Sequence, residues 1–364
     1  MSNRGSAAGG PGRPRSATMK MRLLNQQFTL REIWKLRRSF APVLLSPRKM
    51  INLGKLRRDL MLRRTSLSGN PSIVMVEPCS YCDISCPMCP VVLNRTRRPR
   101  ADLPFPVFQR LIDQIGDELM LITFWNFGEP LLNQDIFRMV RLAKTKKIIC
   151  ALSSNLLSLT PPRAEEMIDS GLDYLIVSCD GASEETYEKF RGKGNFRRVV
   201  ENLAYLTRRR AEKKVVRPFV NLQFIVMREN EHEIGAIREL SRTMGADKLS
   251  LKKFTYVSEE TRSFLPANPA YVLGKYAQGT AMTFCARPWT SAVLCADGSV
   301  VPCCGDLDFA RRFGSLADGN SAFPAIWNGE KYRRFRSAVL KDINEIEMCR
   351  TCPSTNFTTD MFIE

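Results

Sequence analysis

Histidine is almost absent from this sequence, which contains only His232 among its 364 residues. A metal site with several histidine ligands is therefore excluded, and a catalytic triad that depends on histidine is disfavoured. Any chemistry has to use cysteine, carboxylate groups or a bound cofactor.

Long apolar runs are also absent. No stretch approaches the roughly 18 apolar residues of a membrane-spanning helix, and no apolar run typical of a secretory signal follows the basic N-terminal residues. The 12 cysteines are therefore expected to be reduced thiols in the cytoplasm and not disulfides. A hydrophobic content of 44% over 364 residues is enough for an α/β barrel with an additional small unit.

Acidic residues are scarce near the N-terminus. Residues 1–70 contain 16 Lys and Arg but only two acids, Glu32 and Asp59, so they carry +14 of the net charge of +18. Residues 1–18 are poor in apolar side chains and are expected to form a disordered basic tail. Residues 19–70 place apolar residues at helical spacing among basic ones, which predicts a basic extension of two amphipathic helices.

Three uses of these helices remain open. Their apolar stripes could dock on the rest of the protein while the charges are solvated. Alternatively, residues 19–64 could contact an anionic membrane, which would place a cytoplasmic protein at the inner membrane face. Binding of nucleic acid is the least favoured use.

Strand-like and helix-like segments alternate over residues 71–257. The alternation predicts an α/β fold with a parallel sheet, which right-handed crossovers would curl into a partial (β/α)6, TIM-like barrel. Catalytic groups are expected at the C-terminal ends of its strands. Residues 258–284 are predicted to be a linker, and residues 285–364 a small, loop-rich, cysteine-containing C-terminal domain. The six predicted strands are Ser72–Glu77, Leu121–Phe127, Ile148–Ser153, Tyr174–Ser178, Phe219–Val226 and Lys248–Phe254.

Three cysteines, Cys82, Cys86 and Cys89, follow the first predicted strand directly. Three thiolates at this spacing indicate a site for a soft metal, but the set lacks a fourth ligand. Either another cysteine such as Cys79 closes a structural zinc site, or one coordination position stays open for chemistry.

This loop resembles the cluster loop of the radical S-adenosylmethionine (radical SAM) superfamily, and Glu77-Pro78 is similar to that family's lead-in. The resemblance implies that Cys82, Cys86 and Cys89 hold a 4Fe-4S cluster whose fourth iron is chelated by S-adenosylmethionine. It also implies an electron donor such as flavodoxin or ferredoxin.

Three further strand ends resemble the family's cofactor contacts. Gly128-Glu129 is similar to the glycine-glutamate motif that receives the amino group of the methionine moiety. Polar residues at the ends of the third and fourth strands are similar to those that hold the ribose and the carboxylate. The residues that the resemblance assigns to cofactor binding are Gly128, Glu129, Ser153, Asn155, Ser178 and Asp180.

The C-terminal part carries a second cysteine set, and Asp297-Gly298 predicts a hairpin turn within it. This part resembles the SPASM extension in its shortened "twitch" form, which implies one auxiliary 4Fe-4S cluster with four thiolate ligands. A zinc site with the same ligands is the alternative. The four predicted ligands are Cys285, Cys303, Cys349 and Cys352.

Two interpretations remain open for several other residues. Cys304 is a hydrogen donor or a packing residue beside the auxiliary site, and Asp306 and Asp308 are the nearest carboxylates that could act as a base. Cys79, Cys150 and Cys179 are expected to be small packing residues. Four arginines after the cluster loop meet a substrate phosphate or are solvated; they are Arg95, Arg97, Arg98 and Arg100.

The resemblance implies a radical SAM oxidoreductase, in which a deoxyadenosyl radical abstracts hydrogen from the substrate. The cysteine spacing looks most like the aminoglycoside-pathway alcohol dehydrogenases, so the expected reaction is dehydrogenation of a hydroxyl on a sugar, cyclitol or lipid-linked glycan. The alternatives are an epimerase that uses Cys304, a peptide-modifying maturase, or a non-catalytic zinc protein whose basic arm binds nucleic acid.

Overall fold

The computed structural model describes residues 20–23, 26–93, 98–192, 194–255, 259–273, 283–307, 310–350 and 352. Its main sheet has nine strands in the order β11-β10-β9-β3-β4-β5-β6-β7-β8. Six of these, β3 to β8, are parallel to one another and adjacent in chain order. The predicted fold class, a six-stranded partial barrel, is confirmed. These strands are β3 (Ile73–Val76), β4 (Leu121–Phe124), β5 (Ile149–Ser154), β6 (Tyr174–Ser178), β7 (Phe219–Val226) and β8 (Lys248–Lys253).

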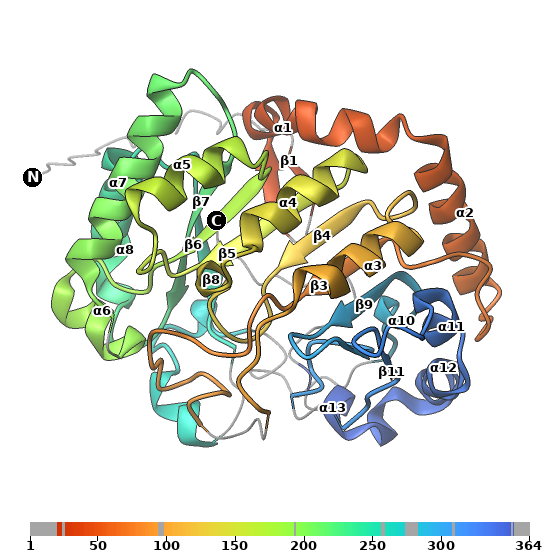
Figure 1. Ribbon diagram of the computed structural model, residues 1–364. Coiled ribbons are helices and arrows are strands. Elements are labelled where there is room, and N and C mark those ends of the chain that lie inside the picture. Colours follow the sequence, from red (N-terminus) through yellow and green to blue (C-terminus); the bar gives the residue numbers. More distant parts are fainter. Residues whose placement is uncertain are drawn as a thin grey trace, which may run out of the picture.

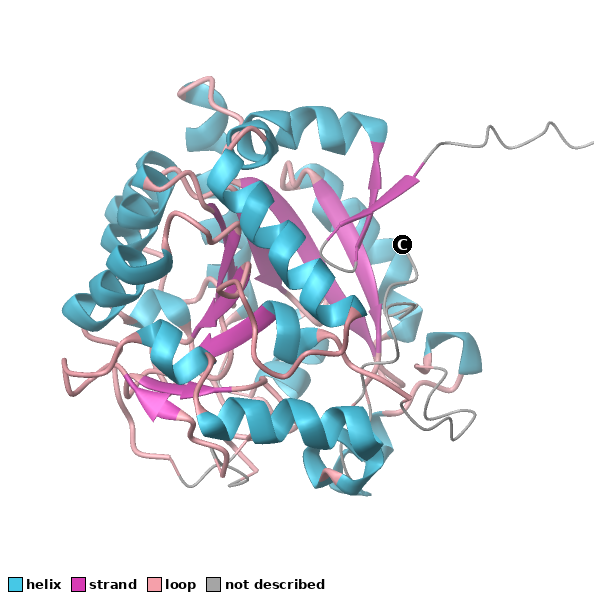
Figure 2. Cartoon of the chain, turned by 90° about the vertical axis from the view of Figure 1, so that its right-hand side faces the viewer, coloured by secondary structure: helices cyan, strands magenta, loops and turns pink. Residues whose placement is uncertain are grey.

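The connecting helices lie outside the curved sheet (Figures 1 and 2). Each buries one apolar stripe against the strands, as α3 does with Phe108, Leu111 and Ile115 at helical spacing. The crossovers therefore place all strand C-termini at one end of the barrel. The helices are α3 (Phe105–Ile115), α4 (Ile136–Thr145), α5 (Pro161–Asp169), α6 (Glu184–Arg191), α7 (Phe196–Glu212) and α8 (Ile234–Thr243), with short 3-10 turns η1 (Pro130–Leu132) and η2 (Glu231–Glu233).

The N-terminal extension forms a short β-ribbon, β1 (Lys20–Leu23) with β2 (Gln26–Thr29), and two helices, α1 (Leu30–Leu44) and α2 (Pro47–Met61). Leu36 and Val43 of α1 are buried in a cluster with the first residues of four barrel strands. Helix α1 therefore closes the N-terminal end of the barrel, and its inner stripe docks on the protein, as one of the three alternatives predicted. The four first residues are Leu121, Ile149, Tyr174 and Phe219.

The C-terminal part is more ordered than its loop-rich sequence suggests. Strand β9 pairs in parallel with β3, so it extends the barrel sheet on the side of the first cysteine loop. The predicted hairpin at Asp297-Gly298 is confirmed, because β9 and β10 are antiparallel on either side of it. The remaining elements are α10 (Arg287–Thr290), β9 (Ser291–Leu294), β10 (Ser299–Val301), β11 (Gly314–Ser315), α11 (Phe323–Trp327), α12 (Glu330–Asp342), η5 (Ile343–Glu345) and α13 (Glu347–Arg350), after η3 (Glu259–Phe264) and η4 (Pro269–Tyr271).

Buried polar contacts fasten this C-terminal part to the segment that follows α2. The Trp289 indole N–H donates to the carbonyl of Arg64 at 2.7 Å, and the Trp327 indole donates to Gly69 at 3.0 Å. The fully buried Arg336 donates to the carbonyl of Thr65 at 2.9 Å and lies over the Trp327 ring. A buried cation without partners would destabilise the folded state. The contacts of Arg336 therefore hold the C-terminal part against the segment that follows α2. No helix among the described residues is long and apolar enough to cross a membrane.

Candidate active site

The first cysteine loop leaves the C-terminal end of β3, where the barrel fold places reactive groups. Cys82, Cys86 and Cys89 are partly exposed free thiols, and the Cys89 amide donates to the Cys86 carbonyl at 3.0 Å. Burial raises the pKa of Cys82 and of Cys86. These thiols therefore ionise readily only when a cation compensates them, as in metal ligation.

Cys79 is not suited to close this set. Its thiol donates to the carbonyl of Glu129 at 3.0 Å and lies 3.3 Å from that of Tyr81. Burial raises the pKa of Cys79 to about 12. Cys79 is thus a buried thiol that binds backbone groups, which favours three protein ligands and an open position.

The Gly128-Glu129 turn lies directly against this loop. Gly128 has φ of +89°, and a Cβ atom on it would lie 2.4 Å from the Cys79 carbonyl oxygen, so only glycine fits. The Glu129 amide donates to the Tyr81 carbonyl at 2.8 Å. The structure therefore brings the end of β4 and the cysteine loop into backbone contact.

The Glu129 carboxylate is buried, and burial raises its pKa to about 7. Its Oε1 accepts from the Leu131 amide at 3.0 Å and the Ser154 hydroxyl at 2.7 Å, and its Oε2 accepts from the Asn155 amide at 2.9 Å. Because a carboxylate oxygen can accept two hydrogen bonds, Oε2 has capacity for a further donor such as an ammonium group.

The ends of β5 and β6 lie beside this turn. The Asn155 amide group donates to Asp83 at 2.8 Å and lies 3.7 Å from the Cys82 sulfur. The hydroxyls of Ser153 and Ser178 are 3.4 Å apart. Three of the predicted cofactor contacts, Gly128, Glu129 and Asn155, therefore touch the cysteine loop, and Ser153 and Ser178 lie at the ends of the neighbouring strands. Ser154 bonds to Glu129, and Asp83 and Ser158, which donates to Asp83, were not predicted.

Asp180 reaches the cysteine loop only through a partner. It forms an ion pair with Arg191 at 2.5 Å and accepts from the Ile225 amide at 2.8 Å. The Arg191 guanidinium lies 3.9 Å from the Cys86 sulfur, and the negative Asp180 raises its pKa despite burial. Sequence reasoning missed Arg191, because its place in the last turn of α6 carries no signal for proximity to Cys86.

Glu77, in the lead-in to the loop, is fully buried and joins three segments. It forms a bidentate ion pair with Arg98, and its oxygens accept from the Phe127 amide at 3.3 Å and the Ala296 amide at 3.0 Å. Both predictions for Arg98 are wrong, because it is neither solvated nor free for a phosphate but neutralises Glu77. Arg100 lies over the Tyr81 ring, and Arg95 and Arg97 lie outside the described residues.

The second cysteine set surrounds Arg287 at the start of α10. The guanidinium is 3.4 Å from the Cys304 sulfur and 4.0 Å from that of Cys303. Cys304, Cys303, Cys285 and Cys352 are all close enough to raise its pKa. The Cys352 amide donates to the Cys349 carbonyl at 3.1 Å, so the fourth predicted ligand is one turn away.

The neighbours of this set are mainly structural. Asp306 is buried and accepts from the Arg311 amide at 2.9 Å, while Asp308 lies outside the described residues. Cys295, which sequence reasoning overlooked, is buried with Val293 and Val301. Cys150 and Cys179 are buried in the main core.

Lys252, near the C-terminal end of β8, is a further residue that sequence reasoning missed. It faces Ile225 across the β7–β8 pair and lines a cavity of about 70 Å³ with Met88 of the cysteine loop. Burial lowers the pKa of Lys252, although both Asp180 and Cys304 are close enough to raise it. Its amine has no hydrogen bond or ion pair to any residue in the described part of the chain.

The donor sets fit iron–sulfur clusters. All 12 cysteines are free thiols. Within the described residues, no three His, Cys, Asp or Glu side chains converge closely enough to hold one metal ion. Donor sets made of thiolates alone are those that iron–sulfur clusters use, with structural zinc sites as the other class.

Together, the barrel, the three-cysteine loop and the C-terminal cysteine set define an iron–sulfur enzyme. Residues 76–240 match the radical SAM superfamily and residues 285–353 match the SPASM iron–sulfur cluster-binding domain. The chain is a radical SAM enzyme with a C-terminal SPASM domain, which gives it a cluster that binds S-adenosylmethionine and auxiliary iron–sulfur. The alternative of a non-catalytic zinc protein is wrong.

Several known proteins are similar over part of the chain. The AdoMet-dependent heme synthase of Methanosarcina barkeri is 28% identical over 182 residues, which is 50% of each protein. The PqqA peptide cyclase of Bradyrhizobium diazoefficiens is 25% identical over 52% of this chain and 48% of its own length. The chain thus spans about half the length of these curated relatives.

Two solved structures share the fold. Streptococcus suis SuiB bound to its precursor peptide SuiA has a TM-score of 0.60 and 16% identity, covering 79% of this chain and 71% of SuiB. BtrN in complex with AdoMet and 2-DOIA has a TM-score of 0.50 and 17% identity, covering 80% of this chain and all of BtrN. The substrates named for such structures are therefore small molecules or peptides.

Proposed function

We propose that this protein dehydrogenates a hydroxyl group of a sugar or cyclitol. The observation that carries the proposal is the place of Lys252, which lines a cavity with Met88 of the cysteine loop and has no ion pair or hydrogen bond to its amine among the described residues. An oxidation of this kind needs a hydrogen-abstracting site, a proton acceptor and an electron acceptor next to one substrate. We assign these three functions to the first cysteine site, Lys252 and the second cysteine site.

The residues have separate tasks. Cys82, Cys86 and Cys89 hold the first cluster, and Cys285, Cys303, Cys349 and Cys352 hold a single auxiliary 4Fe-4S cluster. When bound, the first cluster and S-adenosylmethionine supply a deoxyadenosyl radical that removes hydrogen from a substrate carbon.

Gly128, Glu129, Ser153, Asn155 and Ser178 would hold S-adenosylmethionine, and Glu129 Oε2, which accepts from the Asn155 amide, would accept a further hydrogen bond from its ammonium group. Asp180 acts as a positioning residue, because it fixes Arg191 beside Cys86. Lys252 accepts the hydroxyl proton, since burial lowers its pKa and makes the neutral amine more available.

Cys304 is less suited to epimerisation than its position in the sequence suggests. The Arg287 guanidinium lies 3.4 Å from the Cys304 sulfur and stabilises a thiolate there. A thiolate has no S–H hydrogen to return to a substrate radical. This favours oxidation over epimerisation, with Cys304 and Asp306 outside the proton-transfer step.

Deuterium transfer tests the proposed reaction. Reduced protein with S-adenosylmethionine and a polyol deuterated at its carbinol carbon is expected to give deuterated deoxyadenosine and one ketone per deoxyadenosine. Mass spectrometry measures both products. Unlabelled deoxyadenosine with every polyol, together with label transfer from a deuterated peptide, would favour a maturase instead.

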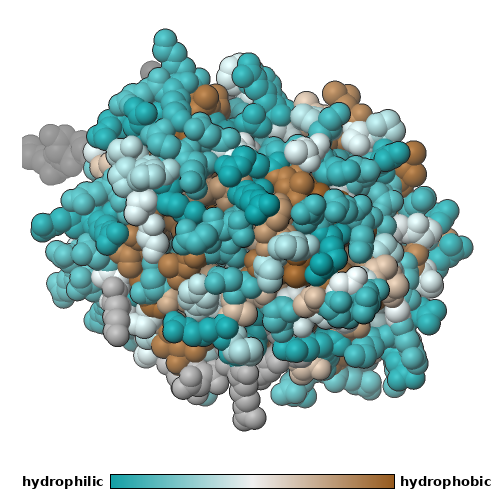
Figure 3. Space-filling model, in the orientation of Figure 1, coloured by the Kyte–Doolittle hydropathy of each residue, from teal (hydrophilic) through white to brown (hydrophobic). Residues whose placement is uncertain are grey.

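A second proposal concerns the outer surface of α1 and α2, for which we propose peripheral contact with an anionic membrane. Seven large apolar side chains are exposed there, including Leu45 at 80% and Ile51 at 60%. The brown surface at the upper right of Figure 3 lies over these helices. The seven are Trp34, Leu44, Leu45, Met50, Ile51, Met61 and Leu62.

Basic side chains surround this apolar surface. Arg38, Lys55 and Arg57 are exposed on the same two helices, whereas Asp59, the acid of α2, is buried. Apolar side chains flanked by arginine and lysine are typical of helices that lie in the membrane interface. Because α1 covers the N-terminal end of the barrel, the cysteine loops would face away from the membrane. This orientation favours a water-soluble substrate over a lipid-linked glycan.

The membrane contact is testable with point variants, whereas deletion of α1 would expose the barrel core. The double variant Leu45→Glu/Ile51→Glu is expected to lower sedimentation with vesicles of anionic phospholipid about tenfold or more, since it places two negative charges in the apolar surface. The control is Val92→Glu, another exposed apolar residue, located on the cysteine loop. Equal sedimentation of the double variant and the wild type would contradict the proposal.

A further inference from the structure

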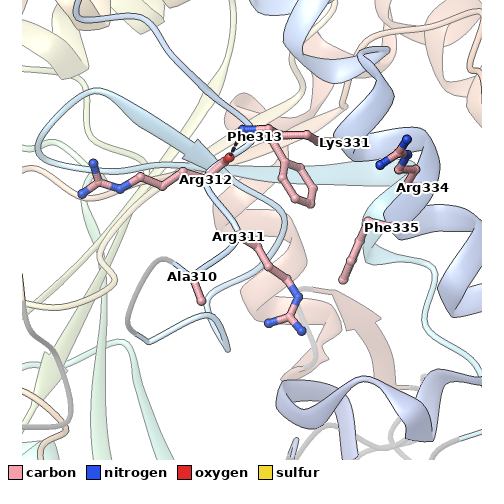
Figure 4. A pocket seen from close by; sticks show the side chains of 7 residues that line it. All are labelled: Ala310, Arg311, Arg312, Phe313, Lys331, Arg334 and Phe335. Atoms are coloured by element: carbon pink, nitrogen blue, oxygen red, sulfur yellow. Dashed lines mark hydrogen bonds between the residues drawn. The ribbon is translucent and has the colours of Figure 1, made fainter.

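A shallow basic basin lies on the C-terminal part, apart from the barrel mouth. It has a volume of about 330 Å³, and its walls come from the segment before β11 and from α12. Figure 4 shows the Phe313 and Phe335 rings and the Arg311 side chain around this space, whereas Arg312 points away from it. We call it the basic basin; its cations are Arg311, Lys331 and Arg334.

The charge of the basic basin is only partly neutralised. Arg334 pairs with Glu330 at 2.5 Å, whereas Lys331 donates to the Arg312 carbonyl at 3.0 Å and has no acidic partner in the part of the chain that the structure describes. Within the described residues, the Arg311 guanidinium has no ion pair. Two of the three cations are therefore available to an acidic partner.

Phe313, which lines the basic basin, is connected through Tyr332 to the strand that precedes the second cysteine set. The Phe313 ring packs edge-on against Tyr332 with centroids 4.6 Å apart. The buried Tyr332 hydroxyl bonds to the carbonyl of Val301, two residues before Cys303, at 3.3 Å. Burial raises the pKa of Tyr332, and the nearby Cys303 raises it further. The basic basin is thus separated from the auxiliary site by two packed aromatic side chains.

We propose that the basic basin is the docking site of an acidic one-electron carrier protein that serves the auxiliary site. This proposal rests on the proposed function. There, the substrate radical loses one proton to Lys252 and one electron to the auxiliary site, and the oxidised carrier takes up that electron. The substrate becomes a ketone and the carrier is reduced by one electron.

Charge complementarity favours a protein carrier over a small anion. The basic basin is shallow, and its cations surround the half-buried Phe313 ring and the buried Phe335 ring, so charged groups dominate its accessible surface, as in surfaces that bind transient charged partners. Electrostatic steering gives such partners fast association that weakens with salt. Electron transfer requires a short distance between the two redox centres, and Phe313 and Tyr332 connect the basic basin to Val301, two residues before Cys303.

Binding of oxidised flavodoxin, measured by calorimetry at several salt concentrations, tests this proposal without relying on turnover. The variant Arg311→Glu/Lys331→Glu is expected to weaken binding about tenfold or more at low salt and to reduce the salt dependence. The matched control is Arg197→Glu/Arg198→Glu, which makes the same charge change on α7, on the barrel. It is expected to change binding less than twofold.

Three results would overturn the proposal. They are unchanged flavodoxin binding in the basic-basin variant, an equal loss of binding in the α7 control, or binding of inorganic phosphate by a protein that does not bind flavodoxin. Circular dichroism and iron content check that each variant folds, and Lys331→Glu alone serves if the double variant does not. Deoxyadenosine formation driven by dithionite, which needs no docking, reports separately on the proposed function. Its absence in the wild-type protein would count against that function while leaving the binding result readable.

Discussion

Replacement of Cys86 by alanine is expected to remove about four of about eight irons per chain and to abolish deoxyadenosine formation. The first site has three thiolates and no substitute, because Cys79 is held as a buried thiol by the carbonyls of Glu129 and Tyr81. Replacement of Cys349 is expected to remove the other four irons but to leave dithionite-driven deoxyadenosine formation in place. Iron and sulfide analysis of anaerobically purified protein, with product chromatography, measures both effects.

The control for these two variants is Cys150→Ala, since Cys150 is buried in the main core and is not part of either cysteine set. Its iron content is expected to equal that of the wild type. Loss of all iron in the Cys349 variant would show that the two sites do not load independently. Four irons in the wild-type protein, with zinc in the remainder, would contradict the auxiliary cluster.

Replacement of Lys252 by methionine is expected to lower ketone formation about 10²–10⁴-fold, the usual contribution of a general base. Methionine keeps most of the side-chain volume but cannot accept the hydroxyl proton. Deoxyadenosine formation in the presence of substrate is expected to continue, because the cofactor contacts at the ends of β4, β5 and β6 are unaffected. In the wild type, ketone formation is expected to fall as the pH drops below the lowered pKa of Lys252.

Lys341, an exposed residue of α12 that is not part of this cavity, supplies the control. Lys341→Met makes the same charge change and is expected to retain ketone formation within about threefold of the wild type and the same pH profile. If Lys252→Met also kept its rate and pH profile, another group would have to accept the proton. Equal losses in both variants would indicate a general effect of the lost positive charge and not proton transfer.

The order of local elements could be predicted from the sequence. Apolar runs of strand length alternate with helical stripes, and this pattern depends only on neighbouring residues, so all six barrel strands were predicted. Turn chemistry is equally local, and Asp297-Gly298 was correctly predicted as a hairpin. Cys82, Cys86 and Cys89 lie within eight residues, so their spacing alone defines a shared site.

Contacts between distant segments could not be predicted in this way. The burial of Arg98 depends on its ion pair with Glu77, whose carboxylate also accepts from the Phe127 amide in the turn after β4 and from the Ala296 amide in the turn after β9. Sequence patterns do not predict these long-range contacts. The sequence pattern of a cluster of arginines is the same whether the side chains are solvated or buried. The use of α1 to close the barrel likewise depends on which of its two faces meets the strands.

The sequence by itself determined the order of the strands, the two cysteine sets and the strong basicity of the N-terminal extension, because each of these is set by composition or short spacing. Tertiary structure alone decided that Arg191 lies beside Cys86 and that Asp180 and Cys304 are close enough to Lys252 to raise its pKa. The reason is physical: the charge and pKa of a buried group depend on neighbours that the fold brings from distant parts of the chain.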